Sequence, residues 1–174
     1  MQSNRIMQPV YPLEEYVALL KKLRLAHAVL EPAILSFNEI EEHTELQAHY
    51  RLTKLDALNK DLQLLGVESS LPKSEVLSLN NIAEAWGAMY VLEGSTLGGA
   101  MILKHLKASQ KWNVEAFSYY GYYGPETGHM WQKFKNILED SVEPTRDYES
   151  LLKGASKAYH TFCNAAEQLE AAGY

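Results

Sequence analysis

Four glycines inside one predicted helix constrain this chain more than any other feature. Residues 87–106 read GAMYVLEGSTLGGAMILKHL, with Gly87, Gly94, Gly98 and Gly99 in an otherwise helical pattern. Each interior glycine costs about 1 kcal/mol relative to alanine. Gly87, Gly94 and Gly98 are seven and four residues apart, so they share one helix face. That face carries almost no side chains, and a flat group can lie directly against its backbone.

Three interpretations account for this face. Small residues allow two helix backbones to pack closely, which is the structural alternative. A phosphate-binding loop is a second interpretation, but the spacing matches neither G-x-x-x-x-G-K-[ST] nor G-x-G-x-x-G, and no strand precedes it. The third is a planar ligand such as a porphyrin, because helical bundles build cofactor sites from facing helices. The residues alone leave the choice open.

Helical periodicity extends over most of the 174 residues. Apolar positions recur every three or four residues. They predict helices over 12–32, 45–65, 81–108, 129–140 and 147–171. The segments ESSLPKS (68–74) and YYGYYGPETG (119–128) are rich in turn residues and predict loops. With no β-alternation, repeat or linker, the chain is expected to form a single all-α domain of six to eight helices over 1–174.

Capping signals refine the ends of these helices. Pro12 suits a first helical turn, and Pro32 is expected to kink or end the same helix. Gly66 is a predicted C-terminal stop. Asn81, followed three residues later by Glu84, resembles a capping box that opens the glycine-bearing helix.

Composition excludes some classes of function. The formal net charge is −6 and the basic residues are scattered, so no nucleic-acid partner is expected. The longest apolar stretch, 82–103, contains Glu84 and Glu93, so no membrane span is expected either. Residues 1–12 lack the apolar core of a secretory signal, and Cys163 is the only cysteine. A lone cysteine is typical of a reducing compartment, which predicts a cytoplasmic protein.

The glycine segment AEAWGAMYVLEGSTLGGAMILKHL resembles the pattern ALGxLYVLEGSxLGG of bacterial biliverdin-producing haem oxygenases, the branch often partnered with bacteriophytochromes. YRLTKLDALNKDLQLLG (50–66) is similar to the R-x-x-K-x-x-x-L-x-x-DL-x-x-LG segment of that family. Three more segments resemble its aromatic-glycine loop, its closing helix and its second helix: 117–134, 151–162 and 14–34. The resemblance covers nearly the whole chain and implies a haem-oxygenase-like bundle.

The resemblance also implies an activity. Haem oxygenases open haem with oxygen to biliverdin and release carbon monoxide and iron, so haem would be both substrate and cofactor. No flavin or iron–sulfur motif is present, so electrons would come from a separate reductase or ferredoxin. A bacteriophytochrome system is a further partner that the resemblance suggests.

In that family the glycine helix is the distal helix, kinked over the haem face where oxygen binds. The resemblance therefore implies that Gly94, Gly98 and Gly99 supply backbone contacts to haem. Ser95 lies beside them, and we expect it to help hold ordered water. A bulky side chain in place of these glycines would block the approach to the porphyrin edge.

Candidate haem-binding side chains lie on three helices. Anionic propionates favour basic groups at the mouth of a pocket, which makes Lys104, Lys133 and Lys135 candidates. Tyr90 lies one turn before Gly94, and Phe162 is a candidate for packing against the ring. The structural alternatives are solvated surface lysines, a core tyrosine and a packed core ring.

No histidine of this sequence matches the position of the family's iron ligand. The family holds iron with a histidine in a T-x-x-x-H-x-x-x-E motif on a first helix, upstream of the segment that matches 14–34. Residues 1–8 match only the tail of that helix, and no histidine precedes His27. His27 has H-x-x-x-E spacing to Glu31 and is a candidate ligand; the alternative is a packed histidine with satisfied nitrogens.

Two explanations of the missing ligand stay open. The recorded sequence starts late, or the chain is a degenerate member of the family. A degenerate member would be a non-catalytic haem- or tetrapyrrole-binding protein, or a helical scaffold with an empty pocket.

Overall fold

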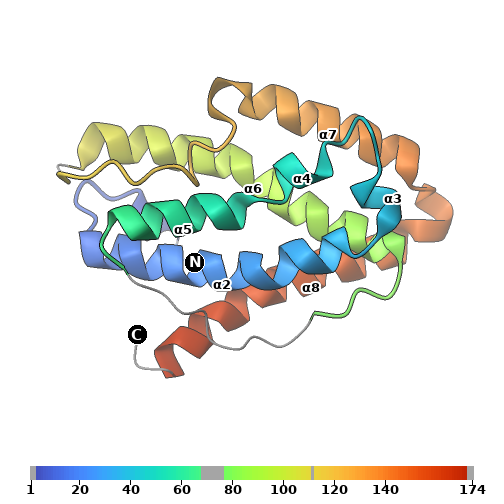
Figure 1. The fold of residues 1–174 in the computed structure, drawn as a ribbon, viewed down its shortest axis with the longest axis horizontal. Coiled ribbons are helices and arrows are strands. Elements are labelled where there is room, and N and C mark those ends of the chain that lie inside the picture. Colours follow the sequence, from blue (N-terminus) through green and yellow to red (C-terminus); the bar gives the residue numbers. More distant parts are fainter. Residues whose placement is uncertain (1–2, 68–76, 111, 172–174) are drawn as a thin grey trace.

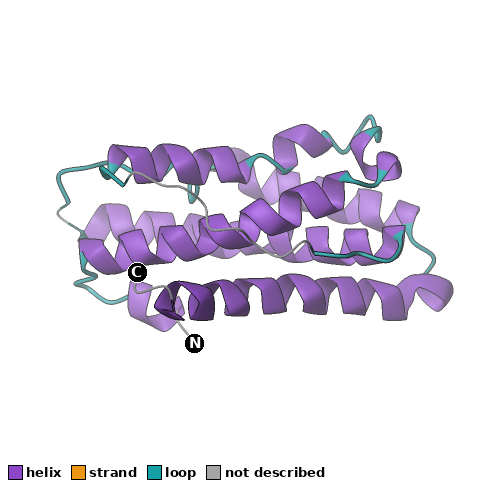
Figure 2. Cartoon of the chain, turned by 60° about the horizontal axis from the view of Figure 1, so that its bottom comes forward, coloured by secondary structure: helices purple, strands orange, loops and turns teal. Residues whose placement is uncertain are grey.

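A computed structural model of the chain describes residues 3–67, 77–110 and 112–171. These residues form eight α-helices and one 3₁₀ helix, with no strand among them (Figure 2). The helices are α1 (Ser3–Ile6), α2 (Leu13–Leu35), α3 (Asn38–Glu41), α4 (Ala48–Arg51), α5 (Lys54–Leu64), α6 (Ile82–Ser109), η1 (Gly124–Glu126), α7 (Thr127–Ser141) and α8 (Pro144–Ala171). The predicted all-α class is confirmed. The connector predicted at 68–74 lies outside the described residues.

The five longer helices extend along the long axis of the molecule, and α6 crosses its centre (Figure 1). α6 packs along α8, against α7 and against α2, while α5 lies beside α2. The main core forms between α2, α6, α7 and α8 around Leu30, Ile34, Trp86, Met89 and Phe134. A second apolar cluster lies between α2, α5 and the C-terminal half of α6. The bundle therefore places the second half of α6 over a separate, smaller core.

The helix predicted over 45–65 is wrong in one respect, because the chain leaves the helix between α4 and α5. In a continuous helix the carbonyl of Tyr50 would accept the N–H of Lys54. Instead it accepts the hydroxyl of Tyr122 at 2.7 Å and that of Thr53 at 3.4 Å. Polar side chains thus replace the backbone bond, and α5 begins at Lys54.

Two capping predictions are confirmed. The Asn81 side chain accepts the backbone N–H of Glu84 at 3.0 Å. Gly66 has φ +72° just after the end of α5, a conformation that suits glycine. Pro32 does not stop α2 at once: the helix continues through it and ends three residues later, at Leu35.

α6 is helical without interruption through all four glycines, so they do not break it. The kink predicted for this helix stays a prediction. The first glycine serves close packing: a Cβ on Gly87 would lie 2.0 Å from the carbonyl oxygen of Leu151 in α8. Gly154 of α8 reciprocates, since its Cβ would lie 1.8 Å from the carbonyl oxygen of Glu84. The helix-packing interpretation therefore holds for Gly87.

Candidate functional site

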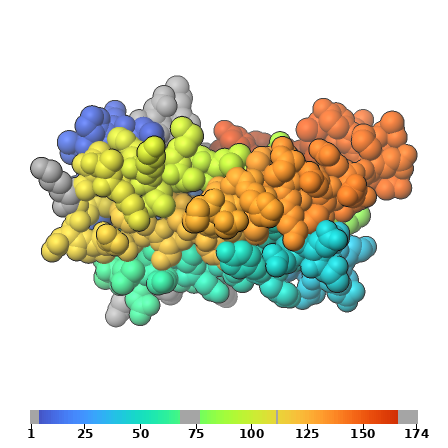
Figure 3. All heavy atoms as spheres, turned by 90° about the horizontal axis from the view of Figure 1, so that it is seen from above, coloured from blue at the N-terminus to red at the C-terminus, as the bar shows by residue number. Residues whose placement is uncertain are grey.

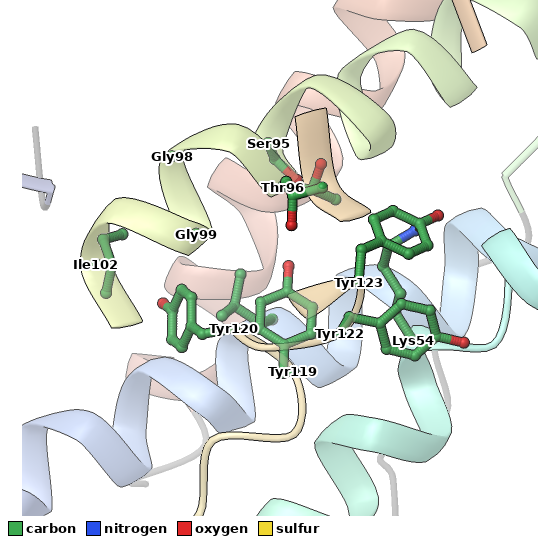
Figure 4. A pocket seen from close by; sticks show the side chains of 12 residues that line it. Lys54, Ser95, Thr96, Gly98, Gly99, Ile102, Tyr119, Tyr120, Tyr122 and Tyr123 are labelled. Carbon is green, nitrogen blue, oxygen red and sulfur yellow. The ribbon is translucent and has the colours of Figure 1, made fainter. Parts of the chain in front are cut away.

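A cavity of about 200 Å³ lies beside the C-terminal half of α6. α6 forms one wall, a tyrosine-rich loop faces it, and Lys54 closes one end (Figure 4). The lining residues are Leu23, Lys54, Ser95, Thr96, Gly98, Gly99, Ile102, Tyr119, Tyr120, Tyr122, Tyr123 and Thr127. The cavity combines bare backbone, aromatic rings and several hydroxyl groups. It can hold water or a small polar ligand beside an apolar surface.

The three later glycines of α6 have different neighbours. A Cβ added to Gly98 would meet no atom within 4 Å, so this position borders open space. One added to Gly99 would lie 3.3 Å from Cδ1 of Tyr120. Gly94 does not line the cavity: a Cβ added there would lie 3.5 Å from the Trp131 ring of α7. The predicted glycine face is therefore divided: Gly98 and Gly99 line the cavity, and Gly94 lies against α7.

The side of α6 that carries Gly94 is partly open to solvent. Tyr90, Leu97 and Met101 are 41%, 39% and 68% exposed, and with Gly94 and Gly98 they recur at helical spacing. We call these five residues the exposed strip. In the space-filling view α7 lies between α6 and the segment around α3 and α4 (Figure 3). The strip exposes three large side chains of α6 beside two glycines.

The tyrosine loop is held from below by a buried carboxylate. Asp61 of α5 is fully buried and accepts the backbone N–H groups of Ser118 at 2.8 Å and Tyr119 at 2.9 Å. Tyr16 of α2 donates its hydroxyl to the carbonyl of Ala116 at 2.8 Å. These bonds fix the start of the loop.

A buried ionic cluster ties α6 to the segment of α4 and α5. Glu93 is fully buried and pairs with Arg51 and with Lys54, whose Nζ lies 2.8 Å from Oε1. The Tyr123 hydroxyl donates to the same oxygen at 2.8 Å. Burial lowers the pKa of Lys54, against the opposing effect of Glu93. Burial, followed by the charge of Glu93, raises the pKa of Tyr123.

His27 lies fully buried beneath the cavity. Its Nδ1 is 2.8 Å from Oε1 of Glu31, and its Nε2 is 3.0 Å from the hydroxyl of Tyr119. Burial lowers the pKa of this imidazole. Because both ring nitrogens have partners, His27 offers no free nitrogen to an iron atom. This arrangement corresponds to the packed, satisfied histidine rather than to the candidate ligand.

The structure brings some predicted site residues together and separates others. Ser95, Gly98 and Gly99 line the cavity, whereas Gly94 and Tyr90 lie on the exposed strip. Tyr90 contacts Trp131, with ring centroids 5.2 Å apart.

The remaining predicted haem contacts lie outside the cavity. Lys135 lies over Trp131, with Nζ 5.8 Å from the ring centroid. Lys133 is half-buried on the same helix, and Lys104 is exposed on α6. Phe162 packs edge-on against His27, with centroids 5.8 Å apart.

Sequence reasoning missed most of the opposite wall. Lys54, Tyr119, Tyr122 and Tyr123 line the cavity, yet none was a candidate. The signal for the tyrosines was the run YYGYY, four aromatic residues in a loop too rich in glycine to form a helix. The signal for Lys54 was its place, with Arg51, in the R-x-x-K part of the segment at 50–66 that resembles the family.

No group of three or more metal-binding side chains occurs in the part of the chain that the structure covers. No histidine lines the cavity there. Nor is any helix within that part long and apolar enough to span a membrane.

Comparison with known proteins assigns the class that this fold and cavity suggest. The family model described as "Heme oxygenase" matches residues 3–168, nearly the whole chain. The chain therefore belongs to the haem oxygenase family.

A protein described as "Heme oxygenase" from Xanthomonas campestris pv. campestris (strain 8004) is similar to it. The two are 30% identical over 118 residues, which cover 66% of this chain and 68% of the relative. No solved structure matches the chain.

Proposed function

We propose that this protein binds haem on the exposed strip of α6 and cleaves it with oxygen to biliverdin, carbon monoxide and iron. Family membership supports haem as the substrate. The observation that carries the proposal is Gly98, where an added side chain would meet only open space. Glycine destabilises a helix relative to alanine, and no neighbouring atom requires it at this position. It leaves room there for a group outside the chain.

The residues on the strip fit one face of a porphyrin. Gly98 offers bare backbone to a planar ring, whereas the Trp131 ring already lies against Gly94. Leu97 and Met101 offer apolar side chains that are otherwise exposed. Trp131 borders the strip beside Gly94. The ammonium groups of Lys104, Lys133 and Lys135 are the candidates for the propionates, with Lys135 next to Trp131. Phe162 would act through His27, which it contacts.

The cavity would supply the polar side of the reaction. Ser95 and Tyr119 place hydroxyl groups on opposite walls, suited to hold ordered water beside Gly98 and Gly99. Bound haem supplies the iron at which oxygen is reduced. Because only backbone separates this water from the strip at Gly98, the hydroxyl groups can orient it toward the bound ring. The axial ligand is not assigned to any residue that lines the cavity.

Other components of the system are proposed on the resemblance alone. Electrons would come from a separate reductase or ferredoxin, in a reducing compartment such as the cytoplasm. A bacteriophytochrome would use the biliverdin.

Haem titration followed by reduction tests the function. Adding ferric haem should produce a Soret band, and ascorbate or reduced ferredoxin should then convert the bound haem to a green bilin. Gly98→Leu should abolish haem binding or turnover, because the side chain would occupy the strip. Ala108→Leu is the matched control: Ala108 is exposed on the same helix, ten residues beyond Gly98 and outside the exposed strip. Unchanged turnover in Gly98→Leu would overturn the proposal.

A second candidate function is a haem carrier without catalysis. It is favoured by His27, whose two ring nitrogens are both engaged. Tight haem uptake without bilin formation would select this carrier, and no uptake would leave a helical scaffold.

A further inference from the structure

A buried chain of hydrogen bonds leads from α2 to the wall of the cavity. Glu31 contacts His27 at 2.8 Å, and His27 contacts the hydroxyl of Tyr119 at 3.0 Å. Tyr119 lines the cavity, and so does Ser95 of α6. The His27 ring is fully buried and Glu31 is 4% exposed. Two titratable groups are therefore enclosed behind one hydroxyl of the cavity wall.

The partners of His27 decide which ring nitrogen carries the hydrogen. Oε1 of Glu31 already accepts the backbone N–H of Leu55 at 3.0 Å, so it acts as an acceptor toward Nδ1 as well. Nδ1 then carries the hydrogen.

The surroundings of the ring keep it neutral. Glu31 on α2 and Lys54 on α5 are the charged groups that act on the imidazole. Tyr119 faces it from the loop and Phe162 from α8. Burial lowers the pKa of His27, which leaves Nε2 without a hydrogen near neutral pH.

The direction of the next bond follows. Nε2 accepts, so Tyr119 donates its single hydrogen to His27. The phenol oxygen is then left with lone pairs only, on the side that faces the cavity. Ser95, which also lines the cavity, donates its own hydroxyl to the carbonyl of Leu92 at 2.7 Å.

We propose that Tyr119 presents a hydrogen-bond acceptor, and no hydrogen, to the cavity. The site would then select ligands with a hydrogen-bond donor, such as water or a hydroxyl, beside Gly98 and Gly99. His27 and Glu31 are positioning residues that hold this direction. The significance for haem cleavage rests on the proposed function, whereas the direction of the bond does not.

Nitrogen NMR of the ligand-free chain tests the direction. In ¹⁵N-labelled protein, with His27→Gln used to assign the signals, His27 should be neutral with its hydrogen on Nδ1. It should stay so while the pH is lowered through the usual imidazole pKa of about 6.5. A hydrogen on Nε2, or protonation of His27 already at that pH, would overturn the proposal.

Variants of Glu31 test its positioning role. Glu31→Leu removes the acceptor, so the hydrogen of His27 should move to Nε2. Glu31→Gln keeps a carbonyl oxygen and should retain hydrogen on Nδ1, which also covers the case in which the leucine variant does not fold. A glutamine variant with its hydrogen on Nε2, or a folded leucine variant that keeps it on Nδ1, would remove Glu31 from this role.

A haem-loaded measurement tests the acceptor itself. Tyr119→Phe should lower haem turnover by about tenfold, the effect of one hydrogen bond, with haem uptake changed less than about twofold. Tyr11→Phe is the control, since it loses a 3.3 Å hydroxyl bond to the carbonyl of Glu15, outside the cavity, and should keep native turnover. Equal turnover in Tyr119→Phe and native protein would overturn the ligand-facing role. If the native chain takes up no haem, the proposed function fails, while the NMR result still decides the bond direction.

Discussion

The two halves of α6 use the same residue type for opposite purposes. In the first half, Gly87 lets the backbone of α8 approach so closely that no side chain fits between them. In the second half, Gly98 faces open space, and Gly99 faces Tyr120 of the loop. Glu93, between the halves, is fixed by Arg51 and Lys54. Glycine thus brings helices together at one end and keeps a surface free at the other.

Loss of the charge between the halves should have the largest effect. Glu93→Gln would leave Arg51 and Lys54 buried without a carboxylate. Breaking such a buried pair costs about 3–5 kcal/mol of unfolding free energy. Urea unfolding measures this loss, with the exposed Glu139→Gln as control, expected within about 0.5 kcal/mol of native. A loss below about 1 kcal/mol would show that the second half of α6 does not depend on the cluster.

The packed half is tested by adding one methyl group. Gly87→Ala would place a Cβ 2.0 Å from the carbonyl oxygen of Leu151, so α6 and α8 must separate. We expect destabilisation of about 3 kcal/mol, at the upper end for overpacking. Denaturant unfolding and loss of far-UV helicity report the change. Native stability in this variant would contradict the close approach of the two helices.

The free energy of unfolding should depend on pH because of His27, which lies beneath the cavity. Burial lowers the pKa of His27 below 6.5 in the folded chain. Below pH 6.5 the unfolded chain binds a proton there that the folded chain does not. The free energy of unfolding therefore falls as pH falls, by up to about 1.4 kcal/mol per pH unit.

The slope disappears above pH 6.5, where the imidazole is neutral in both states. Urea unfolding of native protein and His27→Gln over this pH range measures the difference in slope. Parallel profiles would show that His27 titrates alike in the two states.

The smallest effect has the opposite sign. Gly98→Ala adds a methyl group that meets no atom within 4 Å, so the gain in helix propensity is unopposed. We expect stabilisation by about 0.5–1 kcal/mol, seen as a higher melting temperature. A destabilised Gly98→Ala would mean that the two halves of α6 do not differ.

Much of the fold could be predicted from local pattern. Spacings of three and four residues located α2, α6, α7 and α8, and Asn81 and Gly66 marked helix ends because caps act within one turn. The break after α4 could not be predicted in this way. It depends on the hydroxyl of Tyr122, 72 residues away from the Tyr50 carbonyl that it contacts.

The candidate site was only half predictable. Ser95, Gly98 and Gly99 lie on one short helical segment, so spacing alone places them together. Spacing also grouped Gly94 with them, but the cavity lies on one side of α6 and Gly94 faces Trp131 on the other. Helical periodicity shows which residues share a face of α6. It does not show which face lies beside the cavity, because that depends on the neighbouring segments.

The sequence by itself determined the helical class, the glycine-bearing helix and the resemblance to haem oxygenases, because periodicity, caps and motifs are local properties of a chain. Only the tertiary structure decided that Gly87 serves packing while Gly98 borders open space. It also decided that Glu31, His27 and Tyr119 form one buried chain of hydrogen bonds. These groups come from segments about 90 residues apart, and packing of the whole bundle brings them within 3.0 Å.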